Sequence, residues 1–116
     1  MQAGSIKDSL DKYSRIFKVL GEKNRLHIMS LLSKRELCVC ELVDLLGISQ
    51  SNVSQHLSKL KSVDLVRERR GKQWIFYSIN QDKKDILGRV LELLPDVSTE
   101  IGKIDLDKNP ERCRLD

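Results

Sequence analysis

The fold of this chain is decided by residues 41–79, which read ELVDLLGISQSNVSQHLSKLKSVDLVRERRGKQWIFYSI. Two short runs with helical apolar spacing, over about 39–46 and 50–62, predict two helices in succession. Gly47 follows the first run and is expected to end that helix in the left-handed conformation. Ser49 is placed to cap the second helix. This order indicates a helix-turn-helix pair.

A β-hairpin and flanking helices complete the predicted fold. Residues 65–70 and 73–79 are rich in strand-forming side chains, and Gly71 is expected to supply the unusual backbone angles of the turn between them. Three further helices are predicted over residues 6–20, 22–34 and 82–94, the last ended by Pro95. The predicted fold class is mainly α with a β-hairpin wing (α+β): a winged helix-turn-helix of four helices, two strands and a last helix.

Composition sets the limits of the fold and its expected location. The 116 residues fit one compact domain, and with only 4% aromatic residues the core must be built from Leu, Ile and Val. No apolar run approaches the roughly 20 residues of a membrane span. The polar amino terminus lacks the apolar stretch of a signal peptide. We therefore expect a cytoplasmic protein with no membrane partner.

The second helix of the pair has the composition of a DNA-reading element. Val53, Leu57 and Leu60 give it one buried face, and its other faces carry short hydrogen-bonding side chains that suit base edges in a major groove about 12 Å wide. The hairpin beside it suits contacts with the phosphate backbone. The candidate DNA-binding residues are Gln50, Ser51, Asn52, Ser54, Gln55, His56, Lys59, Arg67, Arg69, Arg70 and Lys72. The alternative is a hydrophilic surface helix on a small α+β domain.

Positive charge is concentrated in the same region. Residues 55–72 hold six basic and two acidic side chains, and six minus two gives +4, the formal net charge of the whole chain. A local basic stripe in a neutral background is expected of a surface that binds double-stranded DNA. The other interpretation is a solvated surface. Within the stripe, His56 is expected to be a phosphate contact or a packing residue rather than a pH switch.

Cys38 and Cys40 form a second constellation, at the start of the helix predicted over 39–46. Inside a regular helix, residues i and i+2 point about 200° apart, so the two thiols share an ion only if Cys38 stays outside helical geometry or the first turn unwinds. Two thiolates without a nearby histidine favour thiophilic ions, and arsenite and antimonite accept three sulfurs. The alternative is that both cysteines are buried as small apolar residues.

Residues 36–79 closely resemble the ArsR/SmtB family of metal-responsive repressors, in its arsenic-responsive ArsR branch, and the resemblance extends over roughly residues 10–94. It implies a homodimer that represses an arsenic-resistance operon and is released by As(III) or Sb(III), with no organic cofactor. A twofold dimer predicts a partly palindromic operator. The dimer interface is expected on the first and last helices, at Leu10, Tyr13, Phe17, Leu87, Val90, Leu91 and Leu94. Residues 1–102 would form the DNA-binding and dimerisation domain, and residues 103–116 a polar, loosely ordered tail.

One position departs from the family pattern. The best-known branch has a third cysteine three residues after the second, where this chain has Val43. Cys113 is the one remaining thiol. Three interpretations stay open: Cys113 folds back as the third metal ligand, within or across protomers; a small thiol or hydroxide supplies it; or Cys113 is not a ligand.

Two other functions compete with the metalloid-responsive repressor. The same winged-helix repressor could use its thiols to respond to oxidants, reactive sulfur or another thiophilic metal. A thiol enzyme needs an activated thiolate beside a general base. The sequence has no Cys-X-X-Cys spacing, no βαβ context and no glycine-rich phosphate loop. We therefore expect that the protein is not an enzyme.

Overall fold

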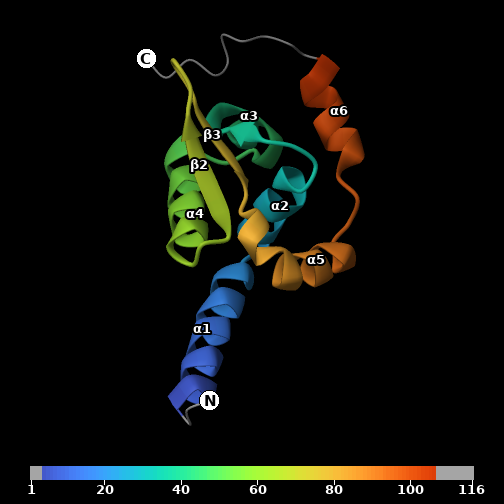
Figure 1. The fold of residues 1–116 in the computed structure, drawn as a ribbon. Coiled ribbons are helices and arrows are strands. Elements are labelled where there is room, and N and C mark those ends of the chain that lie inside the picture. The colour runs from blue at the N-terminus through green and yellow to red at the C-terminus, as the bar shows by residue number, and fades with distance from the viewer. Residues whose placement is uncertain (1–3, 107–116) are drawn as a thin grey trace.

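The computed structural model describes residues 4–106 as helices around a small antiparallel sheet (Figure 1). Its elements are α1 (Gly4–Leu20), α2 (Lys23–Leu32), β1 (Leu37–Cys38), α3 (Val39–Leu46), α4 (Gln50–Ser62), β2 (Val66–Arg70), β3 (Ile75–Ile79), the 3₁₀ helix η1 (Gln81–Lys83), α5 (Lys84–Leu93) and α6 (Ser98–Leu106). The winged helix-turn-helix fold is confirmed, with two elements that the sequence did not predict: β1 and α6. In the described part of the chain, each helix is too short or too polar to cross a lipid bilayer.

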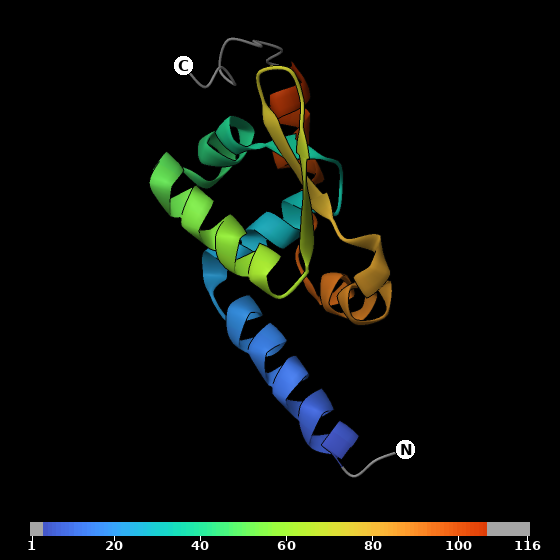
Figure 2. The same ribbon diagram turned by 60° about the vertical axis from the view of Figure 1, so that its left-hand side comes forward.

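The helix-turn-helix follows the prediction closely. Gly47 ends α3 in the left-handed region, with φ 69° and ψ 28°, and its N–H donates to the Val43 carbonyl at 2.9 Å. Ser49 then caps α4, because its Oγ accepts a hydrogen bond from the Asn52 N–H at 3.1 Å. These two local signals fix the turn between α3 and α4, and Figure 2 shows the two helices side by side.

The sheet has three strands in the order β1-β3-β2, all antiparallel. In β3, Phe76 pairs with Cys38 on one side and with Arg69 on the other. The expectation for Gly71 was wrong, because its φ is not positive. The residue must be small for another reason: a Cβ there would lie 3.2 Å from Cε2 of Phe76. The turn closes with the Gly71 N–H donating to the Trp74 carbonyl at 2.7 Å.

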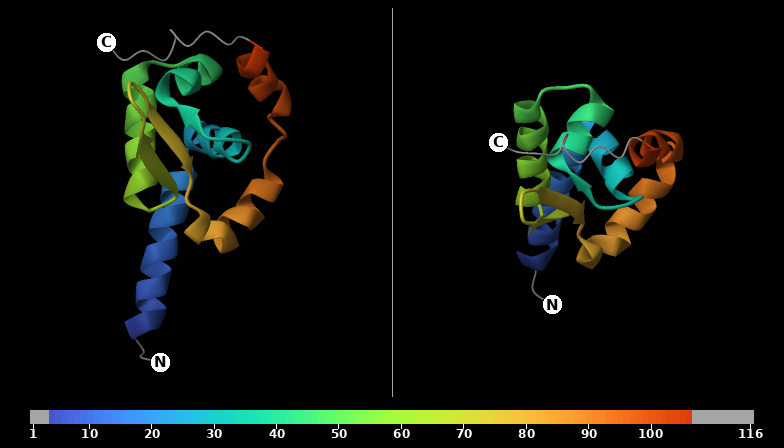
Figure 3. Two further views of the ribbon diagram at one scale, coloured as in Figure 1. Left: turned by 45° about the horizontal axis from the view of Figure 1, so that its top comes forward. Right: turned by 90° about the horizontal axis from the view of Figure 1, so that it is seen from above.

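The core is built from aliphatic side chains, as the composition predicted, with Met29 added. Helix α2 runs through its centre and is buried around its carboxyl half, from Ile28 to Leu32. Seen from above, α2 and α3 lie between α4 on one side and α6 on the other (Figure 3). The core therefore holds α4 and the wing on one side of the protomer.

Helix α1 projects away from the rest of the molecule (Figure 1). Its carboxyl end is anchored by Ile16 and Leu20, which are buried in the core. The remaining apolar stripe is exposed: Ile6 by 65%, Leu10 by 65%, Tyr13 by 43% and Phe17 by 55%. A contiguous apolar face on a helix without intramolecular support indicates a surface that another molecule covers.

The helix predicted over 82–94 is present as η1 followed by α5, and it ends before Pro95 as expected. Asn80 caps this segment, because its Oδ1 accepts from the Asp82 N–H at 3.0 Å. One interface assignment was wrong: Leu87 is only 1% exposed and packs in the protomer core, so it is not available to a partner. Leu93, by contrast, is 84% exposed.

Helix α6 was not predicted. Val97, Ile101 and Ile104 are buried, and Nε2 of His27 on α2 lies 3.1 Å from both carboxylate oxygens of Glu100. The helix continues past Gly102, so residues 103–106 are not part of a loose tail. Cys113 lies outside the described residues.

Candidate nucleic-acid interface and thiol site

Helix α4 separates its apolar and polar side chains onto two faces. Val53, Leu57 and Leu60 are fully buried against the core. The outward face holds exposed side chains from the predicted set: Gln50, Ser51, Asn52, Ser54, Gln55 and Lys59. Because these polar groups share one side of a rigid helix, the arrangement suits insertion into a groove and simultaneous contact with several base edges.

His56 lies differently from the rest of that set. Its side chain is only 16% exposed and faces the amino end of α2, where Nδ1 lies 3.2 Å from Nη1 of Arg25 and Nε2 lies 3.9 Å from Oε2 of Glu22. Desolvation of Glu22 opposes its ionisation, but hydrogen bonds from the backbone N–H groups of Arg25 and Asn24 lower its pKa overall. His56 therefore ties α4 to the start of α2, the packing role that the sequence had left open.

The three wing arginines are exposed but already paired within the protomer. Nη2 of Arg67 lies 2.7 Å from Oδ2 of Asp82. Nε of Arg70 lies 3.7 Å from a Glu68 oxygen. Arg69 donates twice to Glu36, which lowers the pKa of that carboxyl. Among residues 4–106, the other predicted phosphate contacts, Lys59 and Lys72, form no ion pair.

The thiol site lies where β1 ends and α3 begins. Cys38 has extended geometry, with φ −89° and ψ 166°, whereas Cys40 is in the first turn of α3. The two Sγ atoms are in contact, 3.3 Å apart. Cys38 is 3% exposed, and Cys40 is half-buried.

A small network holds this junction in place. The Cys38 N–H donates to Oε1 of Glu41 at 3.0 Å, and Oε2 of Glu41 pairs with Nη2 of Arg35 at 3.0 Å. Within residues 4–106, no group of three or more Cys, His, Asp or Glu side chains is placed to hold a metal ion. The described part of the chain therefore offers two converging sulfurs, with Val43 half-buried one turn further along α3.

A polar-faced second helix, a basic wing and a projecting apolar helix together define a winged helix-turn-helix DNA-binding protein. The chain belongs to the ArsR family: residues 22–68 match the family described as "Bacterial regulatory protein, arsR family". It is therefore a DNA-binding transcriptional repressor and not an enzyme.

Individual relatives agree with this family. The chain is 38% identical to an uncharacterized HTH-type transcriptional regulator, MJ1325, from Methanocaldococcus jannaschii. The alignment spans 88 residues, which are 74% of this chain and 99% of that protein. It is 34% identical to an arsenical resistance operon repressor from Staphylococcus xylosus, over 74% of this chain and 83% of that protein. Among solved structures, a homodimeric winged helix-turn-helix domain from Mycobacterium bovis matches with a TM-score of 0.68 and 25% identity, covering 93% of this chain and 94% of that one.

Proposed function

We propose that this repressor binds the operator of an arsenic-resistance operon as a homodimer and is released when As(III) or Sb(III) binds the thiolates of Cys38 and Cys40. The observation that carries the proposal is the 3.3 Å separation of the two Sγ atoms, which depends on the extended backbone of Cys38. An arsenical resistance operon repressor among the relatives supports the same inducer class.

The separation of the sulfurs favours a pyramidal ion. An ion at a metal–thiolate distance of about 2.3 Å from both sulfurs would subtend an angle of about 90° between them. This angle is smaller than the tetrahedral angle of a structural zinc site. It suits a three-coordinate As(III) or Sb(III) centre, whose lone pair compresses the angles between its ligands. Thiolates are also the ligands that soft ions prefer.

The third ligand is proposed to be Cys113. Helix α6 packs against α3, whose first turn contains Cys40, and ends at Leu106. Cys113 follows Leu106 by seven positions, and a fully extended chain of that length spans at most about 25 Å. We propose that this length allows Cys113 to reach the thiol site, from the same protomer or from its partner.

X-ray absorption at the arsenic edge tests the ligand set. We expect three sulfur neighbours in the wild-type protein and two after Cys113→Ser. A three-sulfur shell that survives Cys113→Ser would assign the third position to another thiol. If arsenic keeps three sulfur neighbours in Cys38→Ser, the proposed metalloid site at Cys38 and Cys40 is wrong. If peroxide releases the operator while arsenite does not, the thiols respond to oxidation instead.

The DNA interface is proposed to combine α4 in the major groove with the wing on the adjacent backbone. On α4, the reading side chains are Gln50, Ser51, Asn52, Ser54 and Gln55, with Lys59 on phosphate. On the wing, the contacts are assigned to Arg67, Arg70 and Lys72. Because two such surfaces are related by a twofold axis in a dimer, the operator is expected to be partly palindromic.

Gln55→Ala and Lys59→Ala are expected to weaken operator binding in different ways. Loss of the Gln55 amide should cost about 1–3 kcal/mol and relax the base preference at one position, because a base-specific hydrogen bond is removed. Loss of the Lys59 ammonium should weaken binding to all sequences and lower the salt slope by about one. Anisotropy titrations of operator and scrambled DNA at several salt concentrations distinguish the two. Identical behaviour of the two variants would contradict this assignment of roles.

The dimer surface is proposed to join α1 and α5. Its α1 part is the exposed stripe of Leu10, Tyr13 and Phe17, to which Ile6 is added. Its second part is Val90 and Leu91 of α5 with Leu94 directly after that helix, to which the highly exposed Leu93 is added. Neither Ile6 nor Leu93 was in the predicted interface. Ile6 extends the stripe of Leu10, Tyr13 and Phe17 at helical spacing, whereas only the burial of Leu87 in the protomer distinguishes it from the exposed Leu93.

A further inference from the structure

We propose that Glu36 and Arg69 are positioning residues that connect the thiol site to the wing, so that inducer binding acts on the wing directly as well as on α3. The inference rests on the proposed function. It adds a second path by which ion binding at the two sulfurs weakens DNA binding. This path runs through the sheet rather than through the helix-turn-helix. It also gives Arg69 a role other than the phosphate contact expected from the sequence.

The first observation is the position of Cys38 in the sheet. Cys38 is the last residue of β1, and its partner in the ladder is Phe76 of β3. Phe76 pairs on its other side with Arg69 of β2. Because directly paired residues present their side chains on the same face of a sheet, Cys38, Phe76 and Arg69 form a row across all three strands.

The second observation is a contact that crosses this row. Glu36 directly precedes β1, and its side chain reaches across β3 to Arg69 of β2. Its carboxylate accepts from Nε of Arg69 at 3.1 Å and from Nη2 at 2.7 Å. The guanidinium of Arg69 in turn lies 4.6 Å from the centre of the Phe76 ring. A bidentate ion pair above an aromatic ring has a defined geometry that a single surface ion pair lacks.

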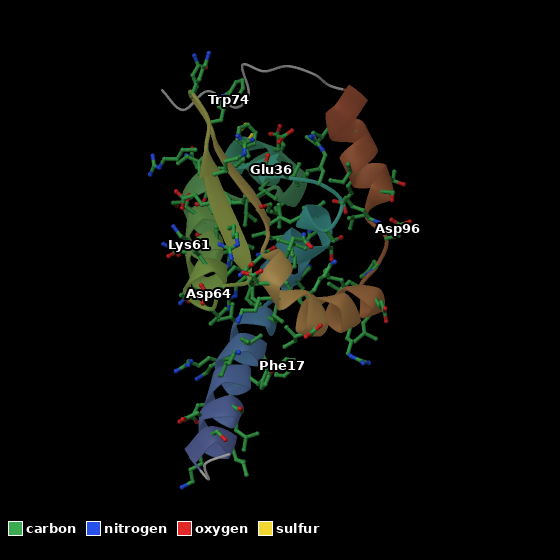
Figure 4. All side chains as sticks on the ribbon, in the orientation of Figure 1. Phe17, Glu36, Lys61, Asp64, Trp74 and Asp96 are labelled. Atoms are coloured by element: carbon green, nitrogen blue, oxygen red, sulfur yellow. The ribbon has the colours of Figure 1, made fainter. Side chains whose placement is uncertain are left out.

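The contact extends to the tip of the wing. Trp74 meets Phe76 edge to face, with ring centres 6.1 Å apart, and the backbone at Gly71 closes over the same ring. Figure 4 shows Glu36 and Trp74 toward the same end of the sheet. A continuous series of contacts therefore connects the strand of Cys38 to the hairpin tip. It runs through Glu36, Arg69, Phe76 and Trp74.

Chelation has a mechanical consequence for this cluster. An ion held by both sulfurs fixes Cys38 relative to Cys40, and therefore β1 relative to α3. Any shift of β1 is transmitted to Phe76 through the ladder and to Arg69 through Glu36. The wing tip then moves relative to α4, and the two DNA-contacting elements no longer match one groove and its neighbouring backbone.

The test compares Glu36→Gln with Asp82→Asn, because each removes a carboxylate partner from one wing arginine. Glu36 holds Arg69 beside the start of β1, whereas Asp82 holds Arg67 to η1. Trp74 is the only tryptophan of the chain, so intrinsic fluorescence reports on the wing without a label. Without inducer, Glu36→Gln should increase amide hydrogen exchange over residues 70–76, and Asp82→Asn should not. Equal exchange in the two variants would overturn the proposal whether or not the protein binds arsenic.

The second arm uses sodium arsenite. Both variants should bind As(III), measured by calorimetry, and should keep inducer-free operator affinity within about fivefold of wild type. In Glu36→Gln the As(III)-dependent change in Trp74 fluorescence should be lost, and the As(III)-induced loss of operator affinity should shrink about two- to thirtyfold. Asp82→Asn should respond as wild type does. A full wild-type response in Glu36→Gln would overturn the inference alone, whereas absence of As(III) binding by the wild-type protein would contradict the proposed function.

Discussion

Replacing Cys38 by serine should leave operator binding unchanged and abolish release by arsenite. Serine has nearly the same size and keeps the extended backbone that starts α3, but its hydroxyl is a poor ligand for a soft ion. Coupling between inducer and DNA typically corresponds to a factor of about 5–150 in affinity, and we expect this factor to fall to one. Anisotropy titrations of a labelled operator with and without arsenite measure both quantities. Release of Cys38→Ser by arsenite would show that the inducer binds elsewhere.

Two further variants make this experiment sharper. Cys40→Ser should behave as Cys38→Ser does, because a single remaining sulfur cannot hold the ion in a fixed position. The double variant Val43→Cys/Cys113→Ser should again be released from the operator by arsenite, because the new thiol at position 43 would replace that of Cys113 as the third sulfur ligand. Residue 43 lies one turn after Cys40, and side chains three residues apart are neighbours on a helix surface. Failure of this combined variant would indicate that position 43 does not face the two sulfurs.

Phe17→Glu should convert the dimer into a monomer with little affinity for the operator. Phe17 is 55% exposed in the protomer and points away from the core of the fold (Figure 4). A carboxylate there would have to be buried without a partner on dimerisation, which costs several kcal/mol. Since a monomer reaches only one half-site, operator affinity should fall by about a hundredfold or more. Analytical ultracentrifugation and operator titration measure the two effects.

The matched control for this variant is Arg15→Gln. It makes the same change of −1 in charge on α1, but residues two apart in a helix point in nearly opposite directions. Arg15→Gln should therefore remain dimeric and bind the operator normally. Circular dichroism should show that both variants keep their helices. A dimeric Phe17→Glu protein would place the interface on another surface.

Local signals explain why the DNA-reading element could be predicted residue by residue. Val53, Leu57 and Leu60 define the buried face of α4 by spacing alone, and Gly47 and Ser49 act within a few residues of their own positions. Such features depend on steric and hydrogen-bonding preferences of short segments. They were therefore visible without knowledge of the rest of the chain.

Features that depend on distant contacts were missed. Strand β1 has only two residues, and it exists because Leu37 and Cys38 pair with a strand almost forty residues away. Helix α6 is polar along most of its length and is held by three buried aliphatic residues and by His27. The inward turn of His56 depends on Arg25 in the same way. Periodicity gave the type of each helix, but not which of its side chains would meet another element.

The paired arginines of the wing have a consequence for how the repressor searches a genome. Non-specific affinity for DNA comes mainly from cations that displace counterions from phosphates, and each phosphate neutralised adds about 0.9 to the salt exponent. Arg67, Arg69 and Arg70 each already have a carboxylate of their own protomer nearby, so each must give up that partner to contribute. The positive charge of the wing is thus partly compensated within the protomer, although Glu68 is shared with Lys61. Such a protein would dwell only briefly on the vast excess of unrelated DNA, and a small number of copies would be enough to keep its operator occupied.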